Sequence, residues 1–529
     1  MAGFKVRFLP QDKMIEVPEN TTILGAERMA GLEPDAPCGG RGVCGKCNVT
    51  IELDGKSEVV SACQTIIDRN MVVDTGRTET KHRILTDGVC RRVEVAPAVE
   101  GAEKGYLMAF DIGTTTIAGY LMDGGTGEQL TIVSTVNPQF QFGADVIARA
   151  NYVLENDGKR MQEVVQDALN ELIEEACKNA GISTQEILLA AIAGNTCMHH
   201  LFLGISPRSL VIAPYVPEIK DGMILDAGEC RMRIHPKGKV MMLPNIAGFV
   251  GADTAACMLA VDFENLEPLT LMVDIGTNGE LVLGNQKKIV TCSTAAGPAF
   301  EGAKIGCGMR GAKGAISHVR VEGLELKLEI IDAETAEGIC GSGLIDVIAL
   351  LIQYGFIDCG GGFAELEELK DEVAVANSWR LQTRDGKPVF LLQEADGKEG
   401  RPEIFISQRD VREVQLAKGA IAAGIRMLIQ KMSVKTEQIE QVLLAGAFGN
   451  YMDTESACMI GLIPYELREK IHGIGNAAGE GTKLAVLNGG LFQDICELVK
   501  QVEAVDLAQE SEFQDMFVDE LEFANAEER

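Results

Sequence analysis

The run YLMAFDIGTTT at residues 106–116 returns as LTLMVDIGTNG at residues 269–279. Each copy is an apolar strand followed by Asp-Ile-Gly-Thr and a further strand-like run. An aspartate that ends a buried strand can orient Mg²⁺ or its waters, while a Gly-Thr turn offers N–H and hydroxyl groups to phosphate oxygens. One copy alone is equally typical of a hairpin turn. Two copies at a domain-sized interval predict two related phosphate-binding halves.

A third run, VLLAGAFGN at residues 442–450, reads as a strand and a turn with two glycines. Such a turn lets an adenosine lie close to the backbone. The ordered set of three runs resembles the acetate and sugar kinase, Hsp70 and actin superfamily. That resemblance implies an α/β multidomain protein in which two ribonuclease-H-like halves clamp ATP and Mg²⁺.

The resemblance also assigns nucleotide-binding positions. The matching residues are Asp111, Gly113, Thr114 and Thr115 in the first turn, Asp274, Gly276, Thr277, Asn278 and Gly279 in the second, and Gly446 and Gly449 for adenosine. Glu280, directly after the second turn, is the candidate to position an attacking water. With Asp111 and Asp274 it completes the predicted catalytic set.

A further glycine pair flanks a serine at Gly341-Ser342-Gly343, before an apolar helix expected at residues 344–353. These residues either present a helix N-terminus to a phosphate or permit close packing, and we favour the nucleotide role.

The cysteines near the N-terminus form a separate pattern. Cys38, Cys44 and Cys47 share the Gly-rich loop CGGRGVCGKC, and Cys63 follows in SACQ. Thiolates at these separations can wrap one cluster, because glycine permits unusual backbone angles and leaves N–H groups free to bond sulfur. Three thiols on one loop and a distant fourth favour a [2Fe–2S] ferredoxin over zinc, which usually takes two paired knuckles. A zinc site is the alternative.

Charge and composition restrict the class of partner. The 529 residues include 78 Asp and Glu against 48 Lys and Arg, a net charge of −30, which argues against nucleic acid or an anionic membrane. Neither a signal segment nor a membrane-spanning apolar run is visible, so we expect a cytoplasmic protein. In such a protein the 15 cysteines are expected to be thiols or metal ligands.

The charge is unevenly distributed. Residues 1–95 carry a net charge of −1, whereas residues 501–529 carry −9. Phe513, Met516, Phe517 and Leu521 recur at helical spacing within that acidic tail, so it is expected to be a docked amphipathic end.

The predicted organisation is five segments. They are a β-grasp ferredoxin-like domain at 1–94, a linker at 95–105 without amphipathic period, the first ATPase half at 106–265, the second half with the adenosine turn at 266–500, and the acidic tail at 501–529.

The ferredoxin head and the ATPase body together resemble the reductive activators of corrinoid proteins. The runs AGNTCMHHLFLG (193–204), PYVP (214–217), GPAFEG (297–302) and CGSGLID (340–346) match that family as well. No counterpart of a long separate middle domain is apparent.

The resemblance implies an ATP-hydrolysing iron–sulfur protein that returns Co(II) corrinoid to Co(I) in a methyltransferase system. The implied cofactors are a [2Fe–2S] cluster, ATP and Mg²⁺. The implied partners are a corrinoid protein, an upstream low-potential electron donor and a second copy of the chain, with no nucleic acid or membrane. Because the reduction is steeply uphill for an ordinary [2Fe–2S] donor, ATP would supply the energy through a conformational change.

Some residues and functions keep a plainer interpretation. His199 and His200 begin an apolar stretch without carboxylate or cysteine partners, so we favour a structural role. Four body cysteines lack ligand spacing and are expected to act as small hydrophobes, namely Cys197, Cys292, Cys307 and Cys340. The alternative functions are a small-molecule kinase, an activator of another low-potential enzyme such as an acyl-CoA dehydratase, and an ATP-sensing redox scaffold.

Overall fold

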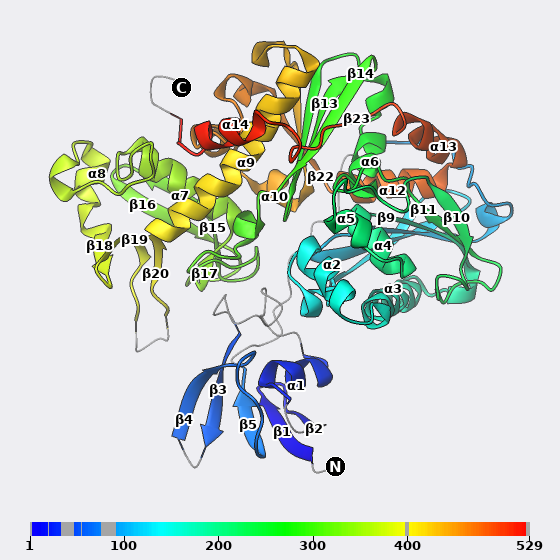
Figure 1. Ribbon diagram of the computed structural model, residues 1–529, viewed down its shortest axis with the longest axis horizontal. Coiled ribbons are helices and arrows are strands. Elements are labelled where there is room, and N and C mark those ends of the chain that lie inside the picture. Colours follow the sequence, from blue (N-terminus) through cyan, green and yellow to red (C-terminus); the bar gives the residue numbers. More distant parts are fainter. Residues whose placement is uncertain are drawn as a thin grey trace.

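The computed structural model describes residues 3–18, 21–32, 47–53, 56–75, 91–396 and 401–524. It contains a small N-terminal sheet and two large sheets with their helices (Figure 1).

The head is a five-stranded sheet crossed by one helix, with the strand order β2-β1-β5-β3-β4. Thr22 caps the helix, because its hydroxyl accepts from the backbone N–H of Gly25 at 3.1 Å. Val6, Phe8 and Ile23 are among the residues of its own apolar core. The elements are β1 (Gly3–Leu9), β2 (Lys13–Pro18), α1 (Ile23–Met29), β3 (Asn48–Leu53), β4 (Lys56–Ser61) and β5 (Met71–Asp74).

The first large sheet has the order β10-β11-β9-β6-β7-β8, and α3 and α4 contribute to the core on one of its faces. Its strands are β6 (Tyr106–Ile112), β7 (Thr116–Asp123), β8 (Gln129–Val136), β9 (Ile187–Gly194), β10 (Met223–Asp226) and β11 (Lys239–Met242). Its helices are α2 (Val146–Glu155), α3 (Lys159–Ala180), α4 (Thr196–Leu203), α5 (Arg208–Val211) and α6 (Ala252–Ala260).

The second large sheet has the order β22-β21-β12-β13-β14-β23. Its strands are β12 (Thr270–Ile275), β13 (Gly279–Asn285), β14 (Lys288–Thr294), β21 (Gln441–Ala445), β22 (Ile471–Gly475) and β23 (Glu503–Ala504). The helices that follow β14 are α7 (Gly341–Gln353), α8 (Glu372–Ala376), α9 (Gln408–Met432), α10 (Gly446–Tyr451), α11 (Thr454–Met459), α12 (Ala477–Leu487), α13 (Gly489–Leu498) and α14 (Phe513–Asp519).

The two large sheets repeat one pairing scheme. In the first, β6 pairs antiparallel with β7 and parallel with β9. In the second, β12 pairs antiparallel with β13 and parallel with β21. The repeated Asp-Ile-Gly-Thr runs therefore mark equivalent strands in two related halves, as the sequence predicts.

A lobe is inserted between β14 and β21 and lies to one side of the second sheet, with α8 and β18–β20 (Figure 1). It holds two three-stranded sheets. Their strands are β15 (Ala315–Glu322), β16 (Glu325–Ile330), β17 (Gly338–Ile339), β18 (Leu381–Arg384), β19 (Lys387–Gln393) and β20 (Ile404–Ser407).

A shared apolar core joins the halves. It contains α6, α12 and residues of both large sheets, including Leu107 of β6 and Met272 of β12. At the contact between the helices, a Cβ at Gly481 of α12 would lie 1.8 Å from the carbonyl oxygen of Ala256, so only glycine fits. The predicted boundary at residue 265 separates the two halves in the sequence. Their packing is nevertheless continuous, because α12, which lies far beyond this boundary, packs against α6 of the first half.

The predicted linker, residues 95–105, lies on the body. The N–H of Ala96 donates to the carbonyl of Leu487 at 2.8 Å, and the N–H of Gly489 donates to the carbonyl of Ala96 at 2.9 Å. Val95 and Val99 pack against the shared core. These residues are therefore attached to α12 and α13, and their lack of amphipathic period does not make them a free tether.

The acidic tail is docked, as its helical spacing predicts. Phe513 and Met516 of α14 pack against the core of the second half, and α14 lies beside α9 (Figure 1). Arg426 of α9 contacts Asp519 at 3.3 Å, and the buried Lys418 donates to the carbonyl of Glu522. Asp519, Glu520 and Glu510 of the tail thus contact basic side chains of α9.

Candidate nucleotide site

A cavity of about 540 Å³ lies where the two Asp-Ile-Gly-Thr turns meet. Residues of both large sheets and of the inserted lobe line it, so it is a site between the halves. The sequence-predicted residues on its wall are Asp111, Gly113, Thr114, Thr115, Asp274, Gly276, Thr277, Asn278, Glu280, Gly341, Ser342 and Gly446.

Glycine is required at two of these positions. A Cβ at Gly113 would lie 2.9 Å from the carbonyl oxygen of Thr116, which accepts the Gly113 N–H in the first turn. Gly446 has a φ of +82°, and a Cβ there would lie 2.7 Å from Asp274 Oδ1. The turn at Gly446 is therefore in close contact with Asp274 of the second Asp-Ile-Gly-Thr turn.

Three predicted glycines do not line the cavity. Gly343 lies in α7, where a Cβ would come within 2.4 Å of the carbonyl oxygen of Ile316. A Cβ at Gly449 would likewise lie 2.9 Å from the Cβ of Leu444. Gly279 begins β13, where a Cβ would approach Thr294 and Ile421. All three glycines allow close packing beside the site.

Four of the carboxyl groups that line this cavity come from four elements, β6, α6, β12 and β13. Burial, together with a smaller contribution from the neighbouring Asp253, raises the pKa of Asp111 and of Asp274 to about 7 each. Burial also raises the pKa of Asp253, which begins α6, to about 6, and that of Glu280 well above its usual value. Desolvated carboxylates that repel one another form a strong site for a cation.

Polar partners orient two of these carboxyl groups. Asn476, the cap of α12, donates from Nδ2 to Asp111 Oδ2 at 3.1 Å and to the Tyr120 hydroxyl at 3.0 Å. The Ser293 hydroxyl donates to Glu280 Oε1 at 3.0 Å. The predicted Glu280 therefore lies on the cavity wall with its side chain already directed by a neighbouring strand.

The threonines of both turns contact a residue to which the sequence assigned no role. Glu301 accepts the hydroxyl of Thr115 at 2.9 Å and that of Thr277 at 2.7 Å. It belongs to GPAFEG, a run noted only for its resemblance. Glu301 is the one charged residue in that run, and this was the sequence feature that could have indicated its role.

The first turn is held from behind by two further residues. Asn195, which caps α4, donates to the Thr114 hydroxyl at 3.0 Å. The fully buried Arg149 of α2 donates to the Thr114 carbonyl and, at 2.9 Å, to the carbonyl of Gly143. Sequence reasoning missed both, although AGNT at residues 193–196 has the Asn cap that often begins a helix.

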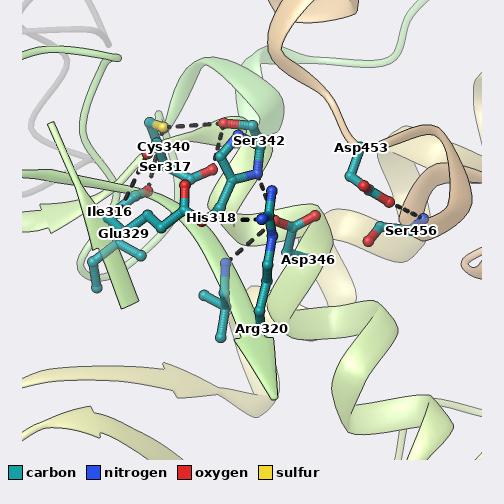
Figure 2. Close-up of polar contacts among 11 residues, drawn as sticks. Ile316, Ser317, His318, Arg320, Glu329, Cys340, Ser342, Asp346, Asp453 and Ser456 are labelled. Atoms are coloured by element: carbon teal, nitrogen blue, oxygen red, sulfur yellow. Dashed lines mark hydrogen bonds and ion pairs between the residues drawn. The ribbon is translucent and has the colours of Figure 1, made fainter. Parts of the chain in front are cut away.

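The lobe supplies one wall of the cavity. His318 of β15 and Asp346 of α7 point toward each other (Figure 2), with His318 Nδ1 and Asp346 Oδ2 2.9 Å apart. This hydrogen bond raises the pKa of His318 above its usual value. Ser342, at the start of α7, donates to the Ser317 carbonyl at 2.8 Å. The wall thus combines a helix N-terminus with a histidine that favours its charged form.

Two further histidines of the body, His199 and His200, lie away from this cavity. Both are fully buried, and His200 lies 2.8 Å from the Thr196 carbonyl. Burial lowers the pKa of His199 to about 3, so it is neutral. Within the described ranges, no three His, Cys, Asp or Glu side chains are grouped to hold a metal ion by themselves.

In the head, the sheet brings two predicted cluster ligands together. Cys47 directly precedes β3 and Cys63 is the second residue after β4, and these antiparallel strands pair Asn48 with Ser61. The Ala62 N–H donates to the Cys47 carbonyl at 2.8 Å. Both thiols are buried, and Gln64 Nε2 lies 3.7 Å from Cys63 Sγ. Cys38 and Cys44 lie outside the described residues.

No helix in the described part of the chain is long and apolar enough to cross a membrane.

Three family models cover most of the sequence. The model described as a 2Fe-2S iron-sulfur cluster binding domain matches residues 6–68. The RACo middle region matches residues 106–266, and the C-terminal domain of RACo, its ASKHA domain, matches residues 268–529. The sequence interpretation that no middle domain has a counterpart here is therefore wrong, because the first half is that region.

Relatives match over nearly the whole length. The corrinoid activation enzyme RamQ of Eubacterium limosum is 31% identical and covers 97% of this chain and 98% of its own. The [Co(II) methylated amine-specific corrinoid protein] reductase of Methanosarcina barkeri is 27% identical over 79% of this chain and 77% of its own. A solved structure of a reductive activator for corrinoid, iron-sulfur protein aligns with a TM-score of 0.70, at 29% identity over 98% of both chains.

Proposed function

This chain belongs to the RACo family of reductive activators of corrinoid proteins, and on that premise we propose that it uses ATP to reduce a Co(II) corrinoid protein to Co(I). The observation that carries the proposal is the union, in one chain, of a ferredoxin-like head and a cavity lined by two phosphate turns. A small-molecule kinase would need only the second of these.

The head carries the redox chemistry. A [2Fe–2S] cluster, held by Cys38, Cys44, Cys47 and Cys63, supplies single electrons. The hairpin β3–β4 supports this ligand set, since it brings Cys47 and Cys63 to the same end of the sheet. Their burial shields reduced thiolates from solvent, and the nearby Gln64 amide is a donor suited to sulfur.

The body binds ATP together with Mg²⁺. The cavity is lined by five carboxyl groups, those of Asp111, Asp253, Asp274, Glu280 and Glu301, whereas the basic residues on its wall are Arg310 and His318. A polyphosphate would be repelled from such a wall unless a divalent cation entered with it. Mg²⁺ usually takes one or two carboxylates, several waters and substrate phosphates, which suits this wall.

The residues divide the work on ATP. Asp111 and Asp274 orient the ion and its waters, one from each half. The backbone N–H groups and hydroxyls of the two turns bind phosphate oxygens, and the Gly446 turn admits the adenosine. Glu280, directed by Ser293, is the carboxylate that orients the attacking water. Because the ligands come from both sheets, nucleotide state changes how tightly the halves close.

Closure connects ATP to the reduction. Electron transfer to Co(II) is uphill for an ordinary [2Fe–2S] donor, so the step requires another source of free energy. Movement of the halves changes the contacts with the corrinoid protein, and these contacts in turn change the ligation of the cobalt. An upstream low-potential donor restores the electron after each cycle, and a second copy of the chain completes the active dimer.

The test is an anaerobic spectral assay. The protein, a chemical reductant, Mg·ATP and a candidate Co(II) corrinoid protein are mixed, and the absorption of Co(I) is followed. We expect Co(I) with ATP and little with AMPPNP. Asp274→Asn should abolish the ATP dependence, while Asp494→Asn, a matched change of an exposed carboxylate on α13, should not. Equal Co(I) formation without nucleotide, or transfer of the phosphoryl group to a small molecule, would contradict the proposal.

A further inference from the structure

Glu301 is placed between the two phosphate turns. It ends the short helix η5 (Pro298–Glu301), which follows β14 in the second half. Its Oε2 accepts from the Thr115 hydroxyl at 2.9 Å and its Oε1 from the Thr277 hydroxyl at 2.7 Å. Thr115 follows β6 and Thr277 follows β12, so one carboxylate connects the two halves at the cavity.

This connection competes with the binding of phosphate. A threonine hydroxyl has a single proton to donate. While Thr115 and Thr277 donate to Glu301, neither can donate to a phosphate oxygen. A phosphate that reached the two hydroxyls would also bring negative charge next to the Glu301 carboxylate, which disfavours keeping both hydrogen bonds. Empty and occupied sites must therefore differ at this residue.

The terminal phosphate is the part of ATP that creates this competition. Both turns line the cavity, and their two threonine hydroxyls contact the same carboxylate, so a phosphate that took the place of that carboxylate would be within reach of both. The adenosine end occupies the Gly446 turn, so the phosphate farthest from the adenosine is the one placed between the turns. ADP, which lacks that phosphate, leaves Glu301 its two donors.

We propose that Glu301 is a positioning residue that senses the terminal phosphate of ATP. It ties Thr115 to Thr277 in the empty and ADP-bound protein, and it releases at least one of them when the terminal phosphate enters. Closure of the halves in the ATP state then differs from closure in the ADP state. This inference rests on the proposed function, because it requires that the cavity bind Mg·ATP.

The decisive variant is Glu301→Gln, measured without any corrinoid partner. Isothermal titration calorimetry gives the dissociation constants for Mg·ADP and Mg·AMPPNP. Glutamine keeps the size of the side chain but removes the charge that opposes the terminal phosphate. We expect AMPPNP to bind about 5- to 30-fold more tightly, the effect of one partly screened charge pair, and ADP to change less than about twofold. Glu322→Gln, an exposed carboxylate at the end of β15, is the control and should change neither constant.

A second measurement uses the wild-type protein and so does not depend on the folding of a variant. Hydrogen–deuterium exchange is followed in peptides that contain residues 298–302 and 113–116. We expect exchange at residues 298–302 to change with Mg·AMPPNP and to stay as in the empty protein with Mg·ADP, whereas exchange at residues 113–116 reports the binding of either nucleotide. The same change at residues 298–302 with both nucleotides would overturn the role of Glu301.

The outcomes separate the two proposals. If neither nucleotide binds, both the ATP assignment and the Glu301 inference are wrong. If both bind and Glu301→Gln leaves the ratio of their dissociation constants unchanged, or weakens AMPPNP, only the Glu301 inference is wrong. A selective gain for AMPPNP, with the exchange difference, supports it.

Discussion

Asp274→Asn should stabilise the protein when no metal is present. Burial raises the pKa of Asp274 to about 7, whereas an unfolded chain releases this proton near pH 4. Between these values the folded state holds a proton that the unfolded state has lost. Stability of the metal-free protein therefore falls as the pH rises from about 4 through about 7.

The size of the pKa shift of Asp274 sets the expected change in the free energy of unfolding. At ~1.4 kcal/mol for each pKa unit, ionising Asp274 in the folded state costs at most about 4 kcal/mol. Relaxation and water around the carboxylate reduce this cost, so we expect about 1–3 kcal/mol. Asparagine has nearly the same shape and does not ionise. At pH 8 the variant should melt about 2–6 °C higher than the wild type, the difference should shrink as the pH falls, and at pH 4 the two should nearly coincide.

The assay is differential scanning fluorimetry in EDTA at both pH values, repeated with Mg·ATP. Wild type should gain stability from Mg·ATP, because the ion neutralises the carboxylate, and Asp274→Asn should lose most of that gain. Asp494→Asn controls for the loss of an exposed charge. A variant that melts lower than wild type at pH 8 without metal, or that keeps the full Mg·ATP shift, would refute the cation-site reasoning.

Three more predictions concern the head, the lobe and the tail. Cys63→Ala should remove the visible absorption of the cluster but leave ADP binding unchanged; a full [2Fe–2S] spectrum would exclude this ligand. Because Asp346 raises the pKa of His318, the KM for ATP should rise only at high pH, and Asp346→Asn should move that rise to lower pH; an unmoved profile would separate His318 from the nucleotide. Phe523→Ala empties a buried site beside Lys418 and should cost about 3–5 kcal/mol, seen as a lower melting temperature with an unaltered cluster spectrum.

Local sequence pattern determined a large part of this protein. The repeated Asp-Ile-Gly-Thr runs predicted two related halves, because an apolar strand, a polar terminus and a glycine turn are properties of neighbouring residues. The helical spacing of Phe513 and Met516 predicted a docked tail for the same reason. The placement of Asp111 and Asp274 on one cavity follows from the symmetry of the two sheets.

Tertiary structure alone decided which other side chains complete the site. Asp253, Asn476 and Glu301 come from the ends of elements far apart in the chain, and no spacing relates them to the turns. Gly343 and Gly449 show the converse: the sequence assigned them to nucleotide binding, but neither lines the cavity. A glycine that admits a ligand and one that admits a neighbouring chain look alike in sequence, and only the packed neighbours distinguish them.

The segment at residues 95–105 makes the physical reason plain. Its composition has no period, which indicated a tether, yet a backbone pairing with residue 488 and two partly buried valines attach it to the body. Sequence records what each residue prefers locally. Whether a distant strand or helix offers it a partner is decided only when the chain has folded.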